Sequence, residues 1–61
     1  MTLRELISKC EVFAPITLIN SKYQVIFSGL SQNVYEHSEL LECAVIKVCA
    51  RDTTLVIYLA T

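Results

Sequence analysis

His37 is the chain's one histidine, and its neighbours Glu36 and Ser38 make it the first residue to test for catalysis. A general base must lie within hydrogen-bond reach of its nucleophile. Consecutive residues of a helix point about 100° apart, so this tripeptide cannot form such a pair. We expect His37 to be a solvated surface residue, with a catalytic or ligand-binding role as the alternative. The sequence predicts no catalytic residue and no enzymatic activity.

Three cysteines, Cys10, Cys43 and Cys49, together with His37 match by count the Cys₃His donor set that zinc accepts. Their spacing argues against a shared ion. Cys43 and Cys49 are six residues apart on one expected strand, which separates them by about 20 Å. We therefore predict no metal site and no cofactor, and interpret the cysteines as small apolar side chains.

The apolar content is high for so short a chain: 54% of its 61 residues are hydrophobic. A domain of about 60 residues buries only roughly 60% of the surface that its unfolded chain exposes. We expect one domain, residues 1–61, whose surplus apolar side chains meet another molecule. The sequence therefore predicts self-association as a dimer or larger oligomer.

Charge, the apolar pattern and cysteine usage argue against nucleic-acid and membrane partners and indicate a compartment. Five Lys and Arg residues against six Asp and Glu residues give a net charge of −1, so no basic patch for nucleic acid is expected. The apolar run at residues 44–60 is interrupted by Lys47, Arg51 and Asp52, which argues against a membrane helix. An odd cysteine count and the absence of an apolar leader stretch within Met1 to Lys9 indicate a reducing cytoplasm.

Periodicity predicts an α+β fold. The segment Thr2-Leu3-Arg4-Glu5 matches a capping box, and apolar residues at helical spacing follow it. Residues 16–19 and 23–27 form one expected hairpin, and residues 43–50 and 54–60 form another. Residues 30–42 between them are expected to form one or two short helical turns. The order is helix, hairpin, short helix, hairpin, with a four-stranded antiparallel or mixed sheet.

Strand alternation assigns the side chains of the second hairpin to two faces. The expected core face carries Ala44, Ile46, Val48, Ala50, Leu55, Ile57 and Leu59. The opposite face is half apolar, and Val45, Val56 and Tyr58 beside Lys47 resemble a protein interface. The alternative is that the first helix covers this face while the middle turns cover the other. In the first hairpin, Tyr23, Val25 and Phe27 are expected to share a face, and Gly29 to form a turn.

Two further groups of residues are candidates for binding. Glu36, Glu39 and Glu42 recur at helical spacing and predict an acidic ridge, which is either a solvated surface or a contact for a basic groove. Tyr23, Tyr35, Lys47 and Arg51, with Lys22 and Tyr58, supply the side-chain types of a small nucleotide pocket. No glycine-rich phosphate loop accompanies them.

The segments TLRELI, YQVIFSGL, ELLECAVIKV and LVIYLA resemble those of small orphan proteins that phages and mobile elements of Gram-positive bacteria encode. That class is similar in size to anti-CRISPR and other anti-defence inhibitors. The resemblance implies a non-enzymatic protein in the bacterial cytoplasm that inhibits a host defence system by occluding a surface of a host protein. One alternative is an oligomeric sponge that sequesters a nucleotide immune signal. Another is an accessory subunit of a larger assembly.

Overall fold

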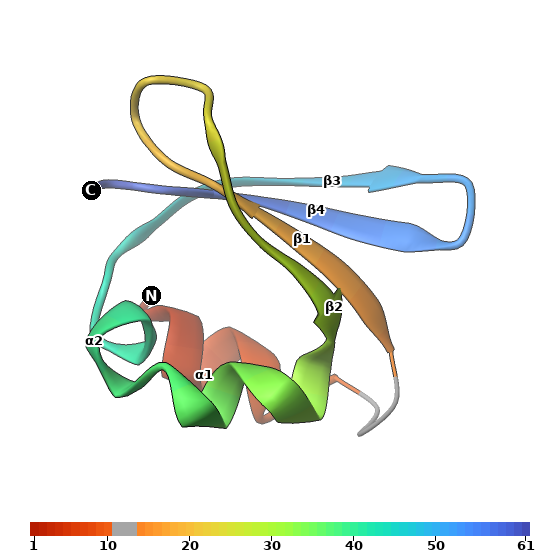
Figure 1. Cartoon of the computed structure of the whole chain (residues 1–61), viewed down its shortest axis with the longest axis horizontal. Helices are drawn as coiled ribbons and strands as arrows, with labels where there is room; N and C mark the ends of the chain where they lie inside the picture. The colour runs from red at the N-terminus through yellow and green to blue at the C-terminus, as the bar shows by residue number, and fades with distance from the viewer. Residues whose placement is uncertain (11–13) are drawn as a thin grey trace.

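A four-stranded sheet lies on one side of the molecule and short helices lie on the other (Figure 1). The computed structural model describes residues 1–10 and 14–61. The strands are β1 (Pro15–Ile19), β2 (Val25–Leu30), β3 (Val45–Arg51) and β4 (Thr54–Leu59), and their order across the sheet is β2-β1-β4-β3. β1 and β4 pair in parallel at the centre, and the two outer pairs are antiparallel. The predicted small α+β class is confirmed, with the sheet in its mixed form.

Helix α1 (Leu3–Ile7) begins where the capping box predicts. The Thr2 hydroxyl accepts from the Glu5 backbone N–H at 3.4 Å, and the Glu5 carboxylate accepts from the Thr2 backbone N–H at 3.3 Å. These reciprocal bonds satisfy two backbone donors that a helix start otherwise leaves open. They also lower the pKa of Glu5, with the bond from the Thr2 backbone as the largest cause.

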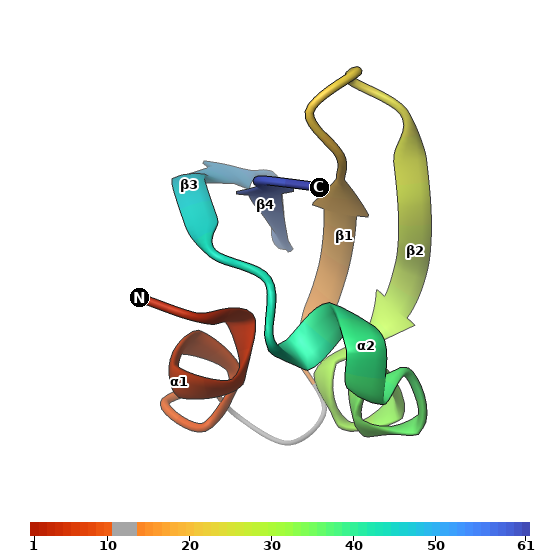
Figure 2. The same ribbon diagram turned by 90° about the vertical axis from the view of Figure 1, so that its left-hand side faces the viewer.

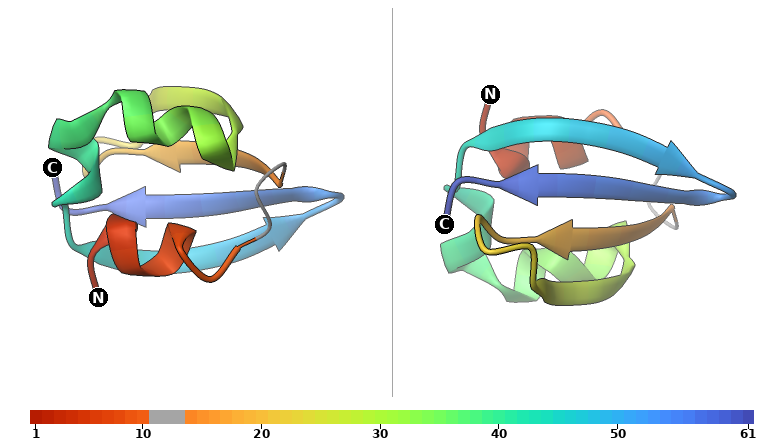
Figure 3. Two further views of the ribbon diagram at one scale, coloured as in Figure 1. Left: turned by 90° about the horizontal axis from the view of Figure 1, so that it is seen from below. Right: turned by 90° about the horizontal axis from the view of Figure 1, so that it is seen from above.

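The middle of the chain forms two short helical segments, η1 (Ser31–Glu36) and α2 (Ser38–Leu41), which are separated at His37. Both lie on the same side of the sheet as α1 (Figure 2). Seen from below, α1 underlies β3 and β4, while η1 and α2 underlie β1 and β2 (Figure 3, left). The three helical segments therefore form a single layer under one face of the sheet.

The core lies between this helical layer and the sheet. Its buried residues come from every element except β2 and β3: Leu3, Ile7, Ile16, Leu18, Val34, Leu41, Ile57 and Leu59. In β4, Ile57 and Leu59 are fully buried, as strand alternation predicts, and Leu55 packs against them from a partly buried position. The parallel pairing with β1 places these side chains beside Ile16 and Leu18.

The predicted core face is wrong for β3, because Ile46 is an extra residue in its pairing with β4. Val45 pairs with Leu59 while Lys47 pairs with Tyr58, so Ile46 has no partner of its own. Such a bulge reverses the face assignment on one side of it. Val45 consequently packs against the core, and Ile46 is 64% exposed.

Val48 and Ala50 are also exposed, although alternation assigned them, with Ala44, to the core. They do pair with the covered residues Ile57 and Leu55 of β4. However, β3 is an edge strand, and the β3–β4 hairpin extends past the helical layer (Figure 1). Val48 and Ala50 therefore lie on the predicted side of the sheet but are not buried, because no helix covers them there.

The first hairpin contains the same irregularity. Leu18 pairs with Phe27 and Ile19 with Val25, which leaves Ile26 without a partner. Phe27 packs against the core, whereas Val25 is 63% exposed on the other side. The expectation that Val25 and Phe27 share a face is therefore wrong, for the same physical reason as in β3.

Gly29 does not form a turn. It lies within β2, pairs with Ile16, and has no positive φ. A methyl group at this position would meet Phe27 Cζ at 3.4 Å, an ordinary contact. The turn conformations with positive φ occur instead at Tyr23, with φ of 63°, and at Asp52, with φ of 56°.

Candidate functional site

Residues 1–10 and 14–61 leave the face of the sheet opposite the helices uncovered (Figure 3, right). The alternative expected α1 to cover one face of the sheet and the middle turns to cover the other. Instead, α1, η1 and α2 all contribute to one core on the same side of the sheet. The interpretation in which α1 covers Val56 and Tyr58 is therefore wrong. We define the open face as this bare side of the sheet, and it is the candidate site.

A groove of about 500 Å³ runs along the open face over β4. Tyr58, Val56 and Thr54 of β4 point into it, each opposite a residue of β3 in the pairing register. The full lining is Thr17, Ile19, Val25, Lys47, Cys49, Arg51, Asp52, Thr54, Val56 and Tyr58. Val56 lies in the middle of the groove, between Thr17 of β1 and Cys49 of β3, and the charged side chains are all contributed by β3 and the β3–β4 turn.

Two tyrosines and a lysine gather at one end of the groove. The rings of Tyr23 and Tyr58 meet edge to face, with centroids 6.2 Å apart. Lys47 Nζ lies 5.7 Å from the centroid of the Tyr58 ring, within the range of a cation–π contact. These three side chains line a smaller pocket of about 200 Å³ together with Asn20, Ser21, Ile46 and Leu59.

The β1–β2 turn that carries Tyr23 is organised by Asn20. The Asn20 side-chain oxygen accepts from the backbone N–H groups of Lys22, at 2.9 Å, and Gln24, at 3.0 Å. The backbone N–H of Tyr23 donates to the Asn20 carbonyl at 3.0 Å. This turn holds Tyr23 at a positive φ, which is uncommon for a bulky residue and marks local strain. Its side chain is nevertheless 80% exposed.

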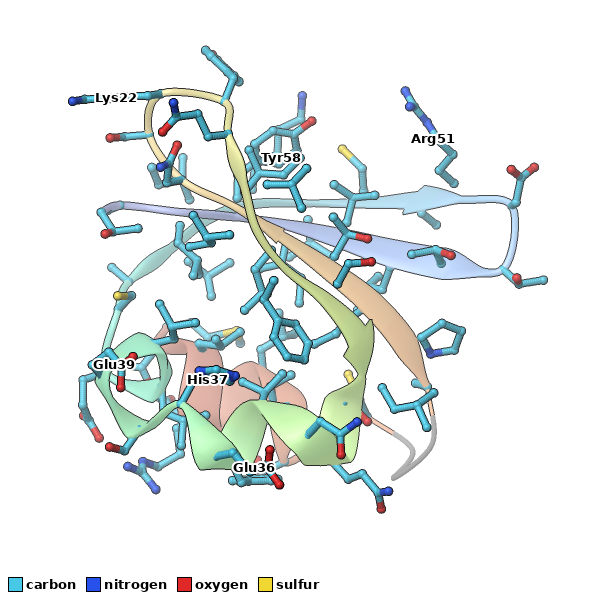
Figure 4. The ribbon with its side chains drawn as sticks, in the orientation of Figure 1. Lys22, Glu36, His37, Glu39, Arg51 and Tyr58 are labelled. Carbon is cyan, nitrogen blue, oxygen red and sulfur yellow. The ribbon has the colours of Figure 1, made fainter. Side chains whose placement is uncertain are left out.

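Charge is divided between the two sides of the molecule. Lys22, Arg51 and Tyr58 lie above the sheet, whereas Glu36 and Glu39 lie on the helical side (Figure 4). Within residues 1–10 and 14–61, one ion pair forms, between Arg4 Nη2 and Glu42 Oε1 at 2.6 Å, and it belongs to the helical side. Lys47 and Arg51 on the open face thus have no carboxylate partner in the described part of the chain.

The structure brings together some of the predicted binding residues and separates others. Lys47, Val56, Tyr58, Tyr23 and Arg51 all border the open face. Val45, predicted with them, packs against the core instead because of the bulge at Ile46. Tyr35, predicted as a nucleotide contact, lies in η1 and lines a separate small hollow beside Ile7 and Ser8.

The three glutamates of the predicted acidic ridge are exposed but do not share one helix. Glu36 ends η1, Glu39 lies in α2, and Glu42 caps the end of α2. Glu42 accepts from Arg4 Nε at 3.1 Å as well as from Nη2. A continuous ridge at helical spacing is therefore not present, because the helix breaks at His37.

His37 and the cysteines lie apart from one another. The His37 ring meets the Phe27 ring edge to face, with centroids 5.4 Å apart. Cys10 Sγ donates to the Leu6 carbonyl and Cys43 Sγ to the Glu39 carbonyl, while Cys49 lines the open face. Among the described residues, no group of three or more His, Cys, Asp or Glu side chains could hold a metal ion.

Sequence reasoning missed several residues of the open face. Ile19 and Thr17 of β1 line the groove because β1 is a central strand with one side bare. Asn20 organises the turn that carries Tyr23. An Asn three residues before a Tyr is not a pattern from which this role could be predicted. Only the alternation in residues 16–19 could have indicated that Thr17 and Ile19 share a face.

No protein-family model matches the chain, and no curated protein or solved structure is detectably similar to it.

None of the helices in the described residues is long and apolar enough to cross a membrane.

Proposed function

We propose that the chain is a non-enzymatic binding protein that uses the open face to occlude a surface of a partner protein. The observation that carries the proposal is the bare, half-apolar side of β4 and β1, where Ile19, Val56 and Tyr58 surround a groove that nothing in the described chain covers. Interfaces combine such an apolar centre with a polar rim. Lys47, Thr54 and Arg51 supply that rim here.

The conformation of Tyr23 supports the same proposal. A tyrosine held at a φ of 63° and 80% exposed contributes little to the core and carries backbone strain. Strained residues occur preferentially where a site must present a side chain. Tyrosine is also enriched at interfaces, because it offers a large rigid contact area with a polar tip.

As the biological setting, we propose phage or mobile-element interference with a bacterial defence system in the host cytoplasm. The support is the resemblance of the sequence segments and the small size of the chain. The self-association predicted from the sequence stays a prediction, and the edge strands β2 and β3 would accommodate it by pairing between copies.

Site-directed photocrosslinking tests the proposal in a bacterial host. We would place a benzoylphenylalanine in place of Tyr58, on the open face, and in a matched variant in place of Tyr35, on the helical side. We expect a partner adduct at position 58 and none at position 35. Equal adducts at both positions, or an adduct at position 35 alone, would contradict the proposed surface.

A second candidate function is a nucleotide sponge, favoured by the convergence of Tyr23, Tyr58 and Lys47 around one pocket. An aromatic ring offers a face to a base, and Lys or Arg can bind a phosphate. Native mass spectrometry of gently purified protein separates the two functions. Extra mass of a nucleotide, lost in Lys47→Ala, would favour the sponge; a bare protein or one holding a protein partner would favour occlusion.

A further inference from the structure

The open face and the helical side carry opposite charge. Above the sheet, the described residues place Lys22, Lys47 and Arg51 with one acidic side chain, Asp52. The described helical side has more acidic than basic side chains. The acidic ones are Glu5, Glu36, Glu39 and Glu42, and the basic ones are Arg4 and Lys9. The overall charge of −1 conceals this separation.

We propose that the open face takes an acidic, extended segment of the partner protein, whose carboxylates pair with Lys47 and Arg51 while its apolar side chains cover Val56 and Tyr58. This inference rests on the proposed function and names the chemistry of the partner. Charge complementarity across an interface selects the partner and speeds association. Both cations have hydrogen-bond donors without a carboxylate partner in the described chain, so they offer charge-assisted hydrogen bonds to the segment.

The spacing of the two cations fits an extended chain. Lys47 and Arg51 pair with Tyr58 and Thr54, so both lie on the open face, with Cys49 opposite Val56 between them. Four residues of strand place their Cα atoms about 13 Å apart. Carboxylates four residues apart in an extended partner would match this distance, and the intervening apolar side chain would lie over Val56.

Two other occupants fit less well. A second copy docked face to face would bring together two grooves that each carry Lys47 and Arg51. Asp52 is the one acidic side chain of each groove, so the two positive charges are not balanced. Single-stranded nucleic acid needs open aromatic faces and several cations that follow its backbone. Here Lys47 already lies over the Tyr58 ring, and the groove has two cations, Lys47 and Arg51, among its lining residues.

Nuclear magnetic resonance titration of the whole chain tests the proposal. The probe is the synthetic peptide Ser-Glu-Ser-Val-Ser-Glu-Ser, as long as the 7-residue β3, whose two Glu side chains and intervening Val side chain share one face when it is extended. A matched peptide with Lys in place of Glu and an oligothymidylate of similar length serve as comparisons. We expect saturable shifts confined to the amides of Lys47, Cys49, Arg51, Val56 and Tyr58 with the acidic peptide alone. Binding should weaken at about 1 M salt, where the Debye length is about 3 Å.

Charge reversal completes the test. The double variant Lys47→Glu with Arg51→Glu should lose affinity for the acidic peptide by about tenfold or more, whereas Lys9→Glu on the helical side should change it less than about twofold. Both variants change exposed side chains, and unshifted core amides would show that each remains folded.

Three results would overturn the inference: no saturable binding of the acidic peptide, equal affinity in the double variant, or preference for the oligothymidylate. A concentration-dependent broadening of the Val56 and Tyr58 amides of the central strand β4, in the protein alone, would also overturn it, because a second copy would then occupy the groove instead of pairing at the β3 edge. A crosslinked partner at position 58 whose binding survives the double charge reversal would leave the proposed function standing while rejecting its acidic chemistry.

Discussion

The two sides of β4 show how differently one strand can be used. Ile57 and Leu59 point toward the helices and are fully buried, whereas Val56 and Tyr58 point the other way and border an open groove. All four side chains are large and apolar or aromatic, so side-chain type does not separate them. What separates them is that the described helical segments all lie on the same side of the sheet (Figure 2).

The difference teaches that the described chain completes its core with one side of the sheet and leaves the other side uncovered. A chain of 61 residues has helical segments of only 4 to 6 residues to cover a sheet of four strands. Those segments all lie where Leu3, Val34 and Leu41 can be buried together. The uncovered side keeps side chains that are costly to leave in water unless another molecule covers them.

Matched truncations on the two sides of β4 should give the largest contrast. Ile57→Ala removes a fully buried side chain at the centre of the core and should cost about 2–5 kcal/mol of unfolding free energy. Val56→Ala, one residue earlier on the open face, should cost less than about 1 kcal/mol. Urea unfolding followed by circular dichroism measures both. Similar losses at the two positions would mean that the open face is packed in solution, as in a dimer.

Backbone strain at Tyr23 sharpens the comparison on the open side. Because Tyr23 has a φ of 63°, Tyr23→Val should be less stable than Tyr23→Gly by about 1–2 kcal/mol, since a β-branched residue disfavours the left-handed conformation. At Val25 in β2, which has no positive φ, we expect the opposite order. Thermal unfolding of these variants gives the comparison. A more stable Val variant at position 23 would contradict the turn conformation described here.

On the helical side, the capping box predicts a smaller effect that depends on pH. Thr2→Ala should lower the unfolding free energy by about 1 kcal/mol at neutral pH. The pKa of Glu5 is lowered in the folded chain, so its contribution is present above its unfolded pKa and is lost as pH falls through the folded value. Glu5→Gln should therefore reduce the acid dependence of stability below about pH 5.

Chemical denaturation of wild type and Glu5→Gln across acidic pH checks this expectation. Glu39→Gln is the matched control, because Glu39 lies in the first turn of α2, where no side-chain cap is formed. Identical pH profiles for wild type and Glu5→Gln would show that the carboxylate does not stabilise α1.

Local patterns predicted the elements well. The capping box at Thr2 and Glu5 located the start of α1, because this signal depends on residues close in sequence. The β-branched runs located β1, β3 and β4 to within about two residues, but β2 lies at Val25–Leu30 and not at the expected residues 23–27. The side on which each residue lies was harder to predict. One unpaired residue in each hairpin, Ile26 and Ile46, reverses the alternation, and an isoleucine in a strand gives no sign that it lacks a partner.

The candidate site was predicted in part. Lys47 lies on the predicted face because it follows the bulge. Val56 and Tyr58 share that face because they alternate regularly along β4. The contact between Tyr23 and Tyr58, residues of separate hairpins, depends on the parallel pairing of β1 with β4. Sequence reasoning could not find that pairing, because two hairpins can join through either edge without any change in local pattern.

The sequence by itself determined the small α+β class, the start of the first helix, the approximate positions of three of the strands and the burial of Ile57 and Leu59, since these follow from local hydrogen bonding and the period of apolar residues. Only the tertiary structure decided which side of the sheet is bare, which residues the bulges displace, and that the cations gather above the sheet while the glutamates lie below it. The physical reason is that covering a face, pairing strands and separating charge all depend on contacts between segments distant in sequence. The free energies of those contacts cannot be predicted from local sequence patterns.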